Sequence, residues 1–180
     1  LILLSSVMLF PGLDHWYLWQ DEALAALLAK NTLKWGIPCV FDGLNVLRNY
    51  PVGVDLTSPV FFLHGWLPFY VNAFIFFFFG ISTFWARFSS AVAGSVFFIF
   101  MFFSLRRLTE SDRASLWGVL SMLFCVPLLL HFRQCDYYGF SILFAWGLFH
   151  FFLPDRNFLR NTAFYLFSLA LVNTALFEWG

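Results

Sequence analysis

Charged residues are scarce in this chain of 180 residues, since only 11% are Asp, Glu, Lys or Arg. Typical soluble domains carry about 25%. Hydrophobic residues make up 61% of the chain, and the mean hydropathy is +0.79. This composition predicts an integral membrane protein in contact with a lipid bilayer. The formal net charge is zero, which argues against a nucleic-acid partner.

Several sequence signatures are also missing. The three cysteines show no CxxC spacing, so neither a disulfide framework nor a zinc knuckle is indicated. The sequence has no Ser-His-Asp nucleophile elbow, glycine-rich phosphate loop or HExxH motif, so hydrolase and nucleotide-driven activities lack support. The chain begins inside the apolar run 1–10 without a basic n-region and ends after another such run. We therefore expect a fragment of a larger polytopic protein.

Long apolar runs dominate what is present. Four segments are expected to span a membrane, at about 85–105, 114–130, 138–153 and 158–177. A fifth run, 59–80, is ambiguous because Pro68 removes a helical hydrogen bond. The uninterrupted part, 69–79, covers roughly 16 Å as a helix, too little to cross a hydrocarbon core of ~30 Å.

Two polar clusters interrupt these runs, at 19–22 (Trp-Gln-Asp-Glu) and 131–138 (His-Phe-Arg-Gln-Cys-Asp-Tyr-Tyr). If segment 59–80 crosses the membrane, the two clusters face opposite sides. If it lies along the outer interface, both clusters face outward and the loops 106–113 and 155–161 are cytoplasmic. Those loops carry five of the ten Lys and Arg residues, as the positive-inside rule expects. We favour the second topology.

The predicted fold is thus an all-α polytopic membrane helix bundle, with membrane-parallel amphipathic helices in a first external loop of about 11–84. Residues 21–35 are predicted to form one such helix, with Asp21 and Glu22 in its first turn and Gly36 with Pro38 at its end. Its apolar stripe follows helical spacing: Leu24, Leu27, Leu28, Asn31 and Trp35.

The polar clusters suggest chemistry, and each has a simpler interpretation. Asp21 with Glu22 suits a general base, although acids at a helix start often only interact with the helix dipole. Arg133 and Asp136 share a helical face, where the guanidinium can bind a phosphate or merely pair with the acid. Arg87 either extends to lipid headgroups or reaches a lipid-linked phosphate.

The remaining candidates are aromatic. His64 lies on the ambiguous segment, and a single His there is expected to hydrogen-bond a headgroup or the backbone. His131 has the same interpretation. Tyr138, with Tyr137, is expected to anchor the chain at the membrane interface or to contact substrate.

The order of these parts resembles a known family. Asp21-Glu22 is followed by a helix ending in Trp-Gly-Ile-Pro at 35–38, then by Ser-Pro-Val-Phe-Phe-Leu-His-Gly-Trp-Leu-Pro at 58–68. Next come Ala-Arg-Phe-Ser-Ser-Ala at 86–91 and Phe-Arg-Gln-Cys-Asp-Tyr-Tyr at 132–138. From about 14 to 153 the chain is similar to the C-type-fold glycosyltransferases that use polyprenyl-phosphate sugars, such as protein O-mannosyltransferases and lipid A aminoarabinose transferases.

The resemblance implies the N-terminal part of one transmembrane catalytic domain, spanning 1–180, of an inverting glycosyltransferase of the plasma (inner) membrane. It would transfer a sugar from a polyprenyl phosphate to a glycan, lipid or protein acceptor at the external or lumenal face. The resemblance makes Asp21 the base, with Glu22 beside it, and makes Arg133, Asp136 and Arg87 donor-binding residues. His64 and Tyr138 join them as substrate-binding candidates.

Two questions stay open at this level. A divalent cation, if one takes part, would be held by Asp21, Glu22 and Asp136. The chain has Thr-Ser-Pro at 57–59 where many members of the family have Lys or Glu before Pro-Pro, so the sugar and the acceptor are not identified. The alternatives to an enzyme are a polytopic transporter, which also carries intramembrane charges, and a non-catalytic membrane subunit.

Overall fold

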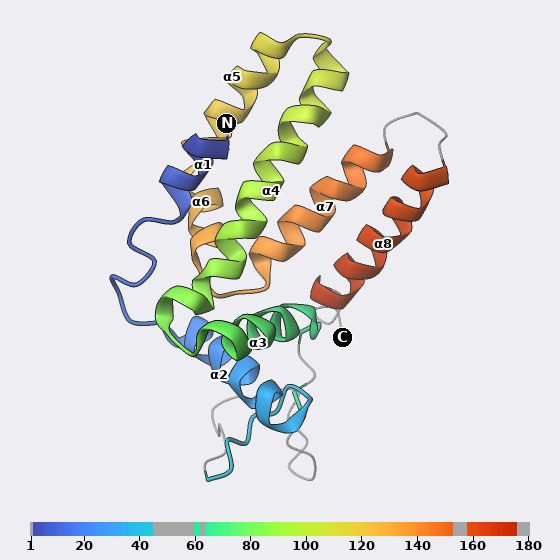
Figure 1. Cartoon of the computed structure of the whole chain (residues 1–180). Coiled ribbons are helices and arrows are strands. Elements are labelled where there is room, and N and C mark those ends of the chain that lie inside the picture. Colours follow the sequence, from blue (N-terminus) through green and yellow to red (C-terminus); the bar gives the residue numbers. More distant parts are fainter. Residues whose placement is uncertain (1, 45–59, 62–63, 153–157, 176–180) are drawn as a thin grey trace.

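The computed structural model describes residues 2–44, 60–61, 64–152 and 158–175 (Figure 1). In this part of the chain the secondary structure is helical, apart from an isolated β-bridge between Cys39 and Val60. The predicted all-α class is therefore confirmed. The helices are α1 (Ile2–Leu9), α2 (Gln20–Trp35), α3 (Leu67–Phe79), α4 (Thr83–Thr109), α5 (Asp112–Leu123), α6 (Val126–Arg133), α7 (Tyr138–Phe152) and α8 (Phe158–Ala175).

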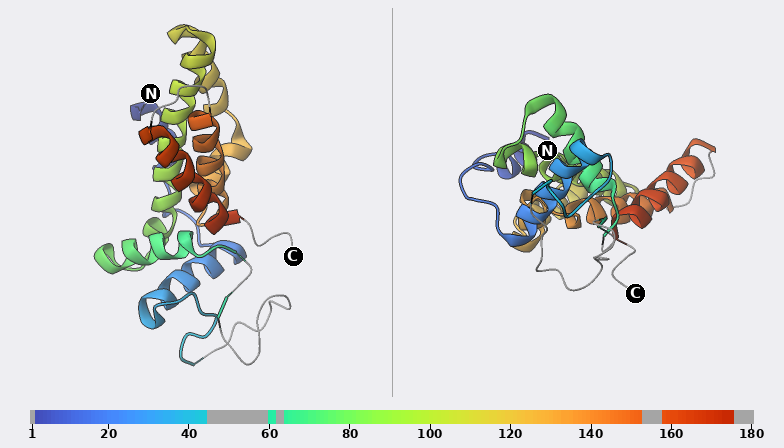
Figure 2. Two further views of the ribbon diagram at one scale, coloured as in Figure 1. Left: turned by 90° about the vertical axis from the view of Figure 1, so that its right-hand side faces the viewer. Right: turned by 90° about the horizontal axis from the view of Figure 1, so that it is seen from below.

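Helices α4, α5 and α7 run along the long axis of the molecule, with α8 beside α7 (Figure 1). Helices α2 and α3 lie across one end of this bundle, as the turned view in Figure 2 makes clear. We call this the crossing end. At the opposite, far end, Glu110 adopts a left-handed conformation (φ 53°) and reverses the chain from α4 into α5.

Helix α2 forms as the sequence predicts. Its apolar stripe buries Leu24, Leu28 and Asn31, and Gly36 ends the helix in a left-handed conformation (φ 77°) that favours glycine. The prediction that Trp35 belongs to the buried stripe was wrong, because 47% of this residue stays exposed. Trp35 instead stacks on Phe41, with the ring centroids 6.4 Å apart.

Helix α3 carries no charged residue and begins where the sequence suggested an interruption. Pro68 lies in its first turn, where a missing N–H costs no hydrogen bond. One face of α3 buries Phe69, Ala73 and Phe76, whereas the opposite face is exposed and also apolar. The exposed face consists of Phe74, Phe77, Phe78 and Phe79.

Membrane-spanning capacity is smaller than predicted. Among the described residues only α4, with 27 residues, is long and apolar enough to cross a membrane by itself. Helices α5 and α6 reach that criterion only together, as a pair bent by 71°. Helices α3 and α7 and the segment Thr162–Thr174 of α8 are apolar but shorter, and 176–177 lie outside the described residues. Four continuous spans are thus not observed.

The predicted span 114–130 is interrupted by a proline. Pro127 lies in the first turn of α6, two residues after the break at Cys125. A proline inside a continuous helix would remove one hydrogen bond and clash with the carbonyl four residues earlier, here that of Leu123. The chain therefore bends where α5 ends and starts α6 anew.

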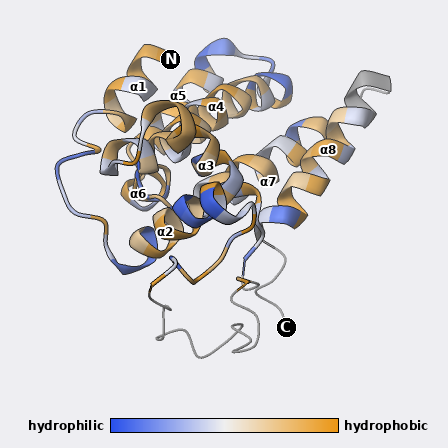
Figure 3. Cartoon of the chain, turned by 60° about the horizontal axis from the view of Figure 1, so that its bottom comes forward, coloured by the Kyte–Doolittle hydropathy of each residue, from blue (hydrophilic) through white to orange (hydrophobic). Residues whose placement is uncertain are grey.

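The main core lies between α1, α4, α5, α6 and α7, with Phe98 and Phe132 completely buried. Gly94 allows α4 to approach α6, because a Cβ there would lie 2.6 Å from Cγ of Phe132. Many large hydrophobic side chains of the described residues stay exposed, while hydrophilic residues gather at the turn between α4 and α5 and on part of α2 (Figure 3). An apolar exterior is what a lipid-embedded bundle requires.

Candidate functional site

The centre of the crossing end is an ion pair between Glu22 of α2 and Arg87 of α4. Glu22 is in the first turn of α2 and reaches back to accept the N–H of Trp19 (3.3 Å), an interaction typical of helix starts. Arg87 follows the start of α4, where Ser82 caps the helix by accepting the N–H of Trp85. Two helix starts thus meet at this point.

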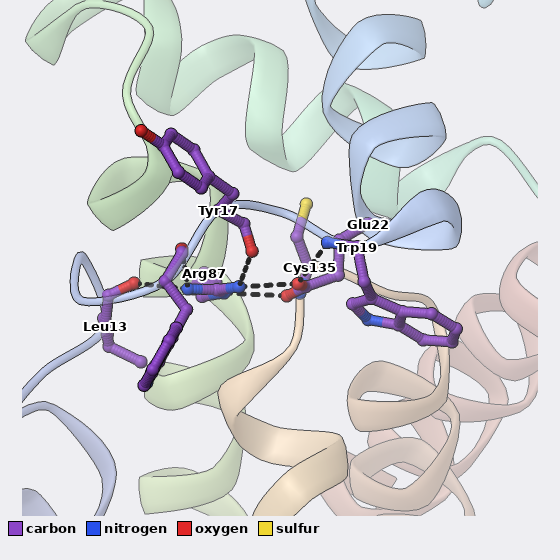
Figure 4. A network of polar contacts seen from close by, with 7 residues as sticks. Leu13, Tyr17, Trp19, Glu22, Arg87 and Cys135 are labelled. Atoms are coloured by element: carbon purple, nitrogen blue, oxygen red, sulfur yellow. Dashed lines mark hydrogen bonds and ion pairs between the residues drawn. The ribbon is translucent and has the colours of Figure 1, made fainter.

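The two side chains form a bidentate pair (Figure 4). Nε of Arg87 donates to Oε1 of Glu22 at 2.8 Å, and Nη2 donates to Oε2 at 2.6 Å. Only 1% of Glu22 and 8% of Arg87 are exposed. Because both side chains are shielded from water, each charge depends on the other for stabilisation.

Arg87 also holds the connection between α1 and α2. Its Nη1 donates to the carbonyls of Leu13 (2.7 Å) and Trp16 (3.0 Å), and its Nη2 donates to that of Tyr17 (3.3 Å). With the two bonds to Glu22, these contacts use all five N–H donors of the guanidinium. Every N–H donor of Arg87 is thus engaged by the protein itself, and the role of Arg87 in donor binding stays a prediction.

Glu22 joins the two polar clusters of the sequence. Its Oε1 also accepts the backbone N–H of Cys135 at 2.8 Å, so residues 22 and 135 are in direct contact. The expectation that both clusters lie at the same end of the bundle is met by the structure. Both oxygens of Glu22 each accept two hydrogen bonds, which fills the capacity of a carboxylate. Glu22 thus makes structural contacts with both of its oxygens, and its catalytic role stays a prediction.

Arg133, at the end of α6, is placed differently from Arg87. Its Nη1 donates to the carbonyls of Met8 (2.7 Å) and Leu9 (3.4 Å), and its Nη2 donates to that of Pro11 (2.7 Å). These contacts satisfy carbonyls at the end of α1. Within the described residues no carboxylate pairs with Arg133, and its Nε is left without a protein acceptor.

A cavity of about 300 Å³ lies between these two arginines. Its walls come from the connection between α1 and α2, the first turns of α2 and α4, and the end of α6. Glu22, Arg87, Arg133 and Gln134 line it together with an apolar and aromatic set, Gly12, Leu13, Trp16, Tyr17, Trp19 and Leu130. The Glu22–Arg87 pair is neutral as a whole, so Arg133 gives the cavity a net positive charge.

The other predicted acids lie beside this cavity without lining it. Asp21 is half-buried in the first turn of α2, and Asp136 is buried and accepts the N–H of Tyr137 at 2.6 Å. In the described part of the chain no three His, Cys, Asp or Glu side chains are arranged to hold a metal ion. The predicted metal site of Asp21, Glu22 and Asp136 therefore finds no support.

The aromatic candidates form one stack at the crossing end. The rings of His64 and Tyr137 are stacked with centroids 4.2 Å apart, and Tyr138 packs on Tyr137 at the same distance. His131 follows at 5.2 Å from Tyr138. The structure thus brings His64 and Tyr138 together through Tyr137, but neither lines the cavity.

A buried polar group beside the ion pair was not predicted. Nδ2 of Asn72 in α3 contacts Sγ of Cys135 at 3.5 Å, and Ser89 of α4 donates to Oδ1 of Asn72. Burial, with Glu22 beside it, raises the pKa of the Cys135 thiol. The thiol is therefore neutral and unsuited to act as a nucleophile.

A second cavity, of about 340 Å³, lies between α3 and α8. The polar atoms of its aromatic walls are turned away, because Trp66 donates to the carbonyl of Phe61 (2.8 Å) and Tyr70 to that of Gly36 (2.8 Å). The lining is otherwise apolar except for the amide of Asn173, whose Nδ2 donates to the carbonyl of Leu169 (2.9 Å).

Comparison of the chain with protein-family models, with curated proteins and with solved structures found no match.

Proposed function

We propose that this chain is part of a membrane glycosyltransferase that moves a sugar from a polyprenyl phosphate to an acceptor at the external or lumenal face. The observation that carries the proposal is Arg133, a guanidinium without a carboxylate partner among the described residues, lining a cavity of about 300 Å³. Arginine is suited to phosphate because its planar N–H donors match the phosphate oxygens. The ordered motifs that resemble the glycosyltransferase family supply the reaction type.

The location of the cavity fits a lipid-linked donor. It lies at the crossing end, beside the start of α4, the helix long enough to span a bilayer. The exposed Phe face of α3 suits a helix lying in the outer leaflet, with its axis across that of α4 (Figure 2). A phosphate headgroup at that depth would meet Arg133 while its isoprenoid chain stayed in hydrocarbon.

The proposed topology is multi-pass, in the plasma (inner) membrane, with the cavity on the external side. Arg106, Arg107 and Arg113 lie at the far end, where the positive-inside rule favours the cytoplasm. Helix α7 ends at the same far end as α4, because His150 in the last turn of α7 and Ser104 near the end of α4 are hydrogen-bonded at 2.9 Å. The connection 153–157 lies outside the described residues.

In the proposed reaction Asp21 removes the proton from an acceptor hydroxyl while that oxygen attacks C1 of the sugar. The bond from C1 to the phosphate oxygen breaks, and its electron pair leaves with the phosphate. Arg133 stabilises the charge on that phosphate. Attack opposite the leaving phosphate inverts the configuration at C1. Glu22 and Arg87 support the reaction indirectly, by holding the first turn of α2 next to the cavity.

The test is sugar transfer by the full-length protein in membranes, measured with radiolabelled dolichyl- or undecaprenyl-phosphate sugars. We expect Asp21→Asn to abolish transfer without reducing the amount of folded protein. Asp14→Asn is the matched control, because Asp14 is an exposed acid of the connection before α2 and lies outside the motifs that resemble the glycosyltransferase family. Full activity in Asp21→Asn would overturn the base assignment. Uptake of substrate without transfer would favour the alternative of a transporter.

A further inference from the structure

The polar groups left free in the charged cavity are few and of definite chemistry. Arg133 supplies a cation, and Gln134 supplies a side-chain amide with no partner among the described residues. The one carboxylate in the lining, Glu22, already accepts four hydrogen bonds. The lining of the cavity thus offers positive charge and neutral hydrogen-bonding capacity but no free carboxylate. Asp21, which acts on the acceptor in the proposed reaction, lies beside the cavity and is not part of its lining.

This inventory discriminates between two kinds of sugar. A protonated amino group needs a carboxylate partner when it leaves water, and close to Arg133 it would also meet a like charge. A hydroxyl group needs only neutral donors and acceptors, and the amide of Gln134 provides both. A site that makes binding of one ligand unfavourable selects effectively for another, and here the ammonium group is the one disfavoured.

The walls of the cavity fit the rest of a neutral sugar. Trp16 and Trp19 contribute flat apolar surfaces, which suit the C–H face of a sugar ring. The volume of about 300 Å³ is at the lower limit for small-molecule sites, so one sugar with its phosphate fills the cavity.

We infer that the cavity selects a neutral, hydroxyl-bearing sugar on its lipid phosphate and rejects an amino sugar, with Gln134 as the specificity-determining residue. This inference rests on the proposed function, because it concerns the donor of the same site. It makes Gln134 a direct contact of the sugar, whereas Arg133 contacts the phosphate.

The experiment measures binding to the purified full-length protein in lipid nanodiscs by isothermal titration calorimetry. The probes are farnesyl phosphate, farnesyl phosphoglucose and farnesyl phosphoglucosamine, the last two differing only by one hydroxyl replaced with an amine. We expect the glucose probe to bind about tenfold more tightly than the glucosamine probe, the effect of one unfavourable charged contact.

Two variants connect this preference to Gln134. Gln134→Glu supplies the missing carboxylate and should reverse the preference, whatever its effect on absolute affinity. Gln134→Ala should weaken both sugar-bearing probes and leave farnesyl phosphate unaffected.

Equal binding of the two sugar probes, or an unchanged preference in Gln134→Glu, would overturn this inference while leaving the proposed reaction intact. Failure of the proposed function gives a different result, namely no sugar transfer in membranes and no binding of farnesyl phosphate.

Discussion

Replacing Glu22 with Gln tests whether this residue serves the fold or the chemistry. The substitution keeps the shape of the side chain and removes its charge. Arg87, 8% exposed, would then lie buried without a counter-charge. An amide also presents one NH₂ group where Glu22 has an oxygen, so a donor would face the N–H groups of Arg87 or Cys135.

Removing one partner of a buried ion pair typically costs about 3–5 kcal/mol. The contacts of Glu22 with Trp19 and Cys135 add to that expectation, because they hold the start of α2 against the segment after α6. We therefore expect Glu22→Gln to lower the free energy of unfolding by about 3–5 kcal/mol. The assay is equilibrium unfolding of the purified protein in detergent micelles, followed by Trp fluorescence.

The matched control is the exposed pair of Arg106 and Asp112, whose atoms approach to 2.7 Å. Both side chains are more than half exposed, so Asp112→Asn should cost less than about 1 kcal/mol. A Glu22→Gln protein that is as stable as the wild type but inactive would refute the structural role and restore Glu22 as a catalytic candidate.

Two further predictions concern packing and pH. Gly94→Ala should destabilise the protein by about 1–3 kcal/mol in the same unfolding assay, because its Cβ would press on the buried Phe132, whereas Gly118→Ala meets only the end of a leucine side chain and should be nearly neutral. Cys135 has a raised pKa, so the unfolded state loses its thiol proton first, and stability should fall above about pH 8.5 by up to roughly 1.4 kcal/mol per pH unit. Comparing pH profiles of unfolding should show this loss absent in Cys135→Ser and retained in Cys125→Ser; identical profiles in all three proteins would contradict it.

Much of the fold follows from apolar periodicity. Three features were predicted because each depends on residues close together in the sequence: the stripe of α2, its end at Gly36 and the long apolar run of α4. The bend between α5 and α6 was missed although Pro127 gave its signal. Length alone does not settle whether α7 and α8 cross a membrane, because the hydrocarbon thickness they meet depends on tilt and on neighbouring helices.

The meeting of the two polar clusters was predicted, but the contacts that Glu22 and Arg87 make there were not. Glu22 shares a helical face with Ala25, Ala26 and Ala29, all buried, so helical spacing already indicated that it points inward. Arg87 likewise shares a face with the small buried residues of α4, Ser90, Ala91 and Gly94.

The partners of Arg87 were beyond sequence reasoning. Three of its five acceptors are backbone carbonyls of the connection between α1 and α2, and every residue type carries such a carbonyl. The cavity beside Arg133 depends on the conformation of the same connection between α1 and α2, so no residue pattern predicts it.

The most direct test of the account is the affinity of farnesyl phosphate for the full-length protein in nanodiscs, compared between wild type and Arg133→Gln. A charged hydrogen bond contributes about 1.5–3 kcal/mol, so the variant should bind at least tenfold more weakly. Arg113→Gln, which removes an exposed arginine at the far end, should bind like the wild type. Equal affinity of all three proteins for farnesyl phosphate would contradict the claim that Arg133 makes this cavity a phosphate site.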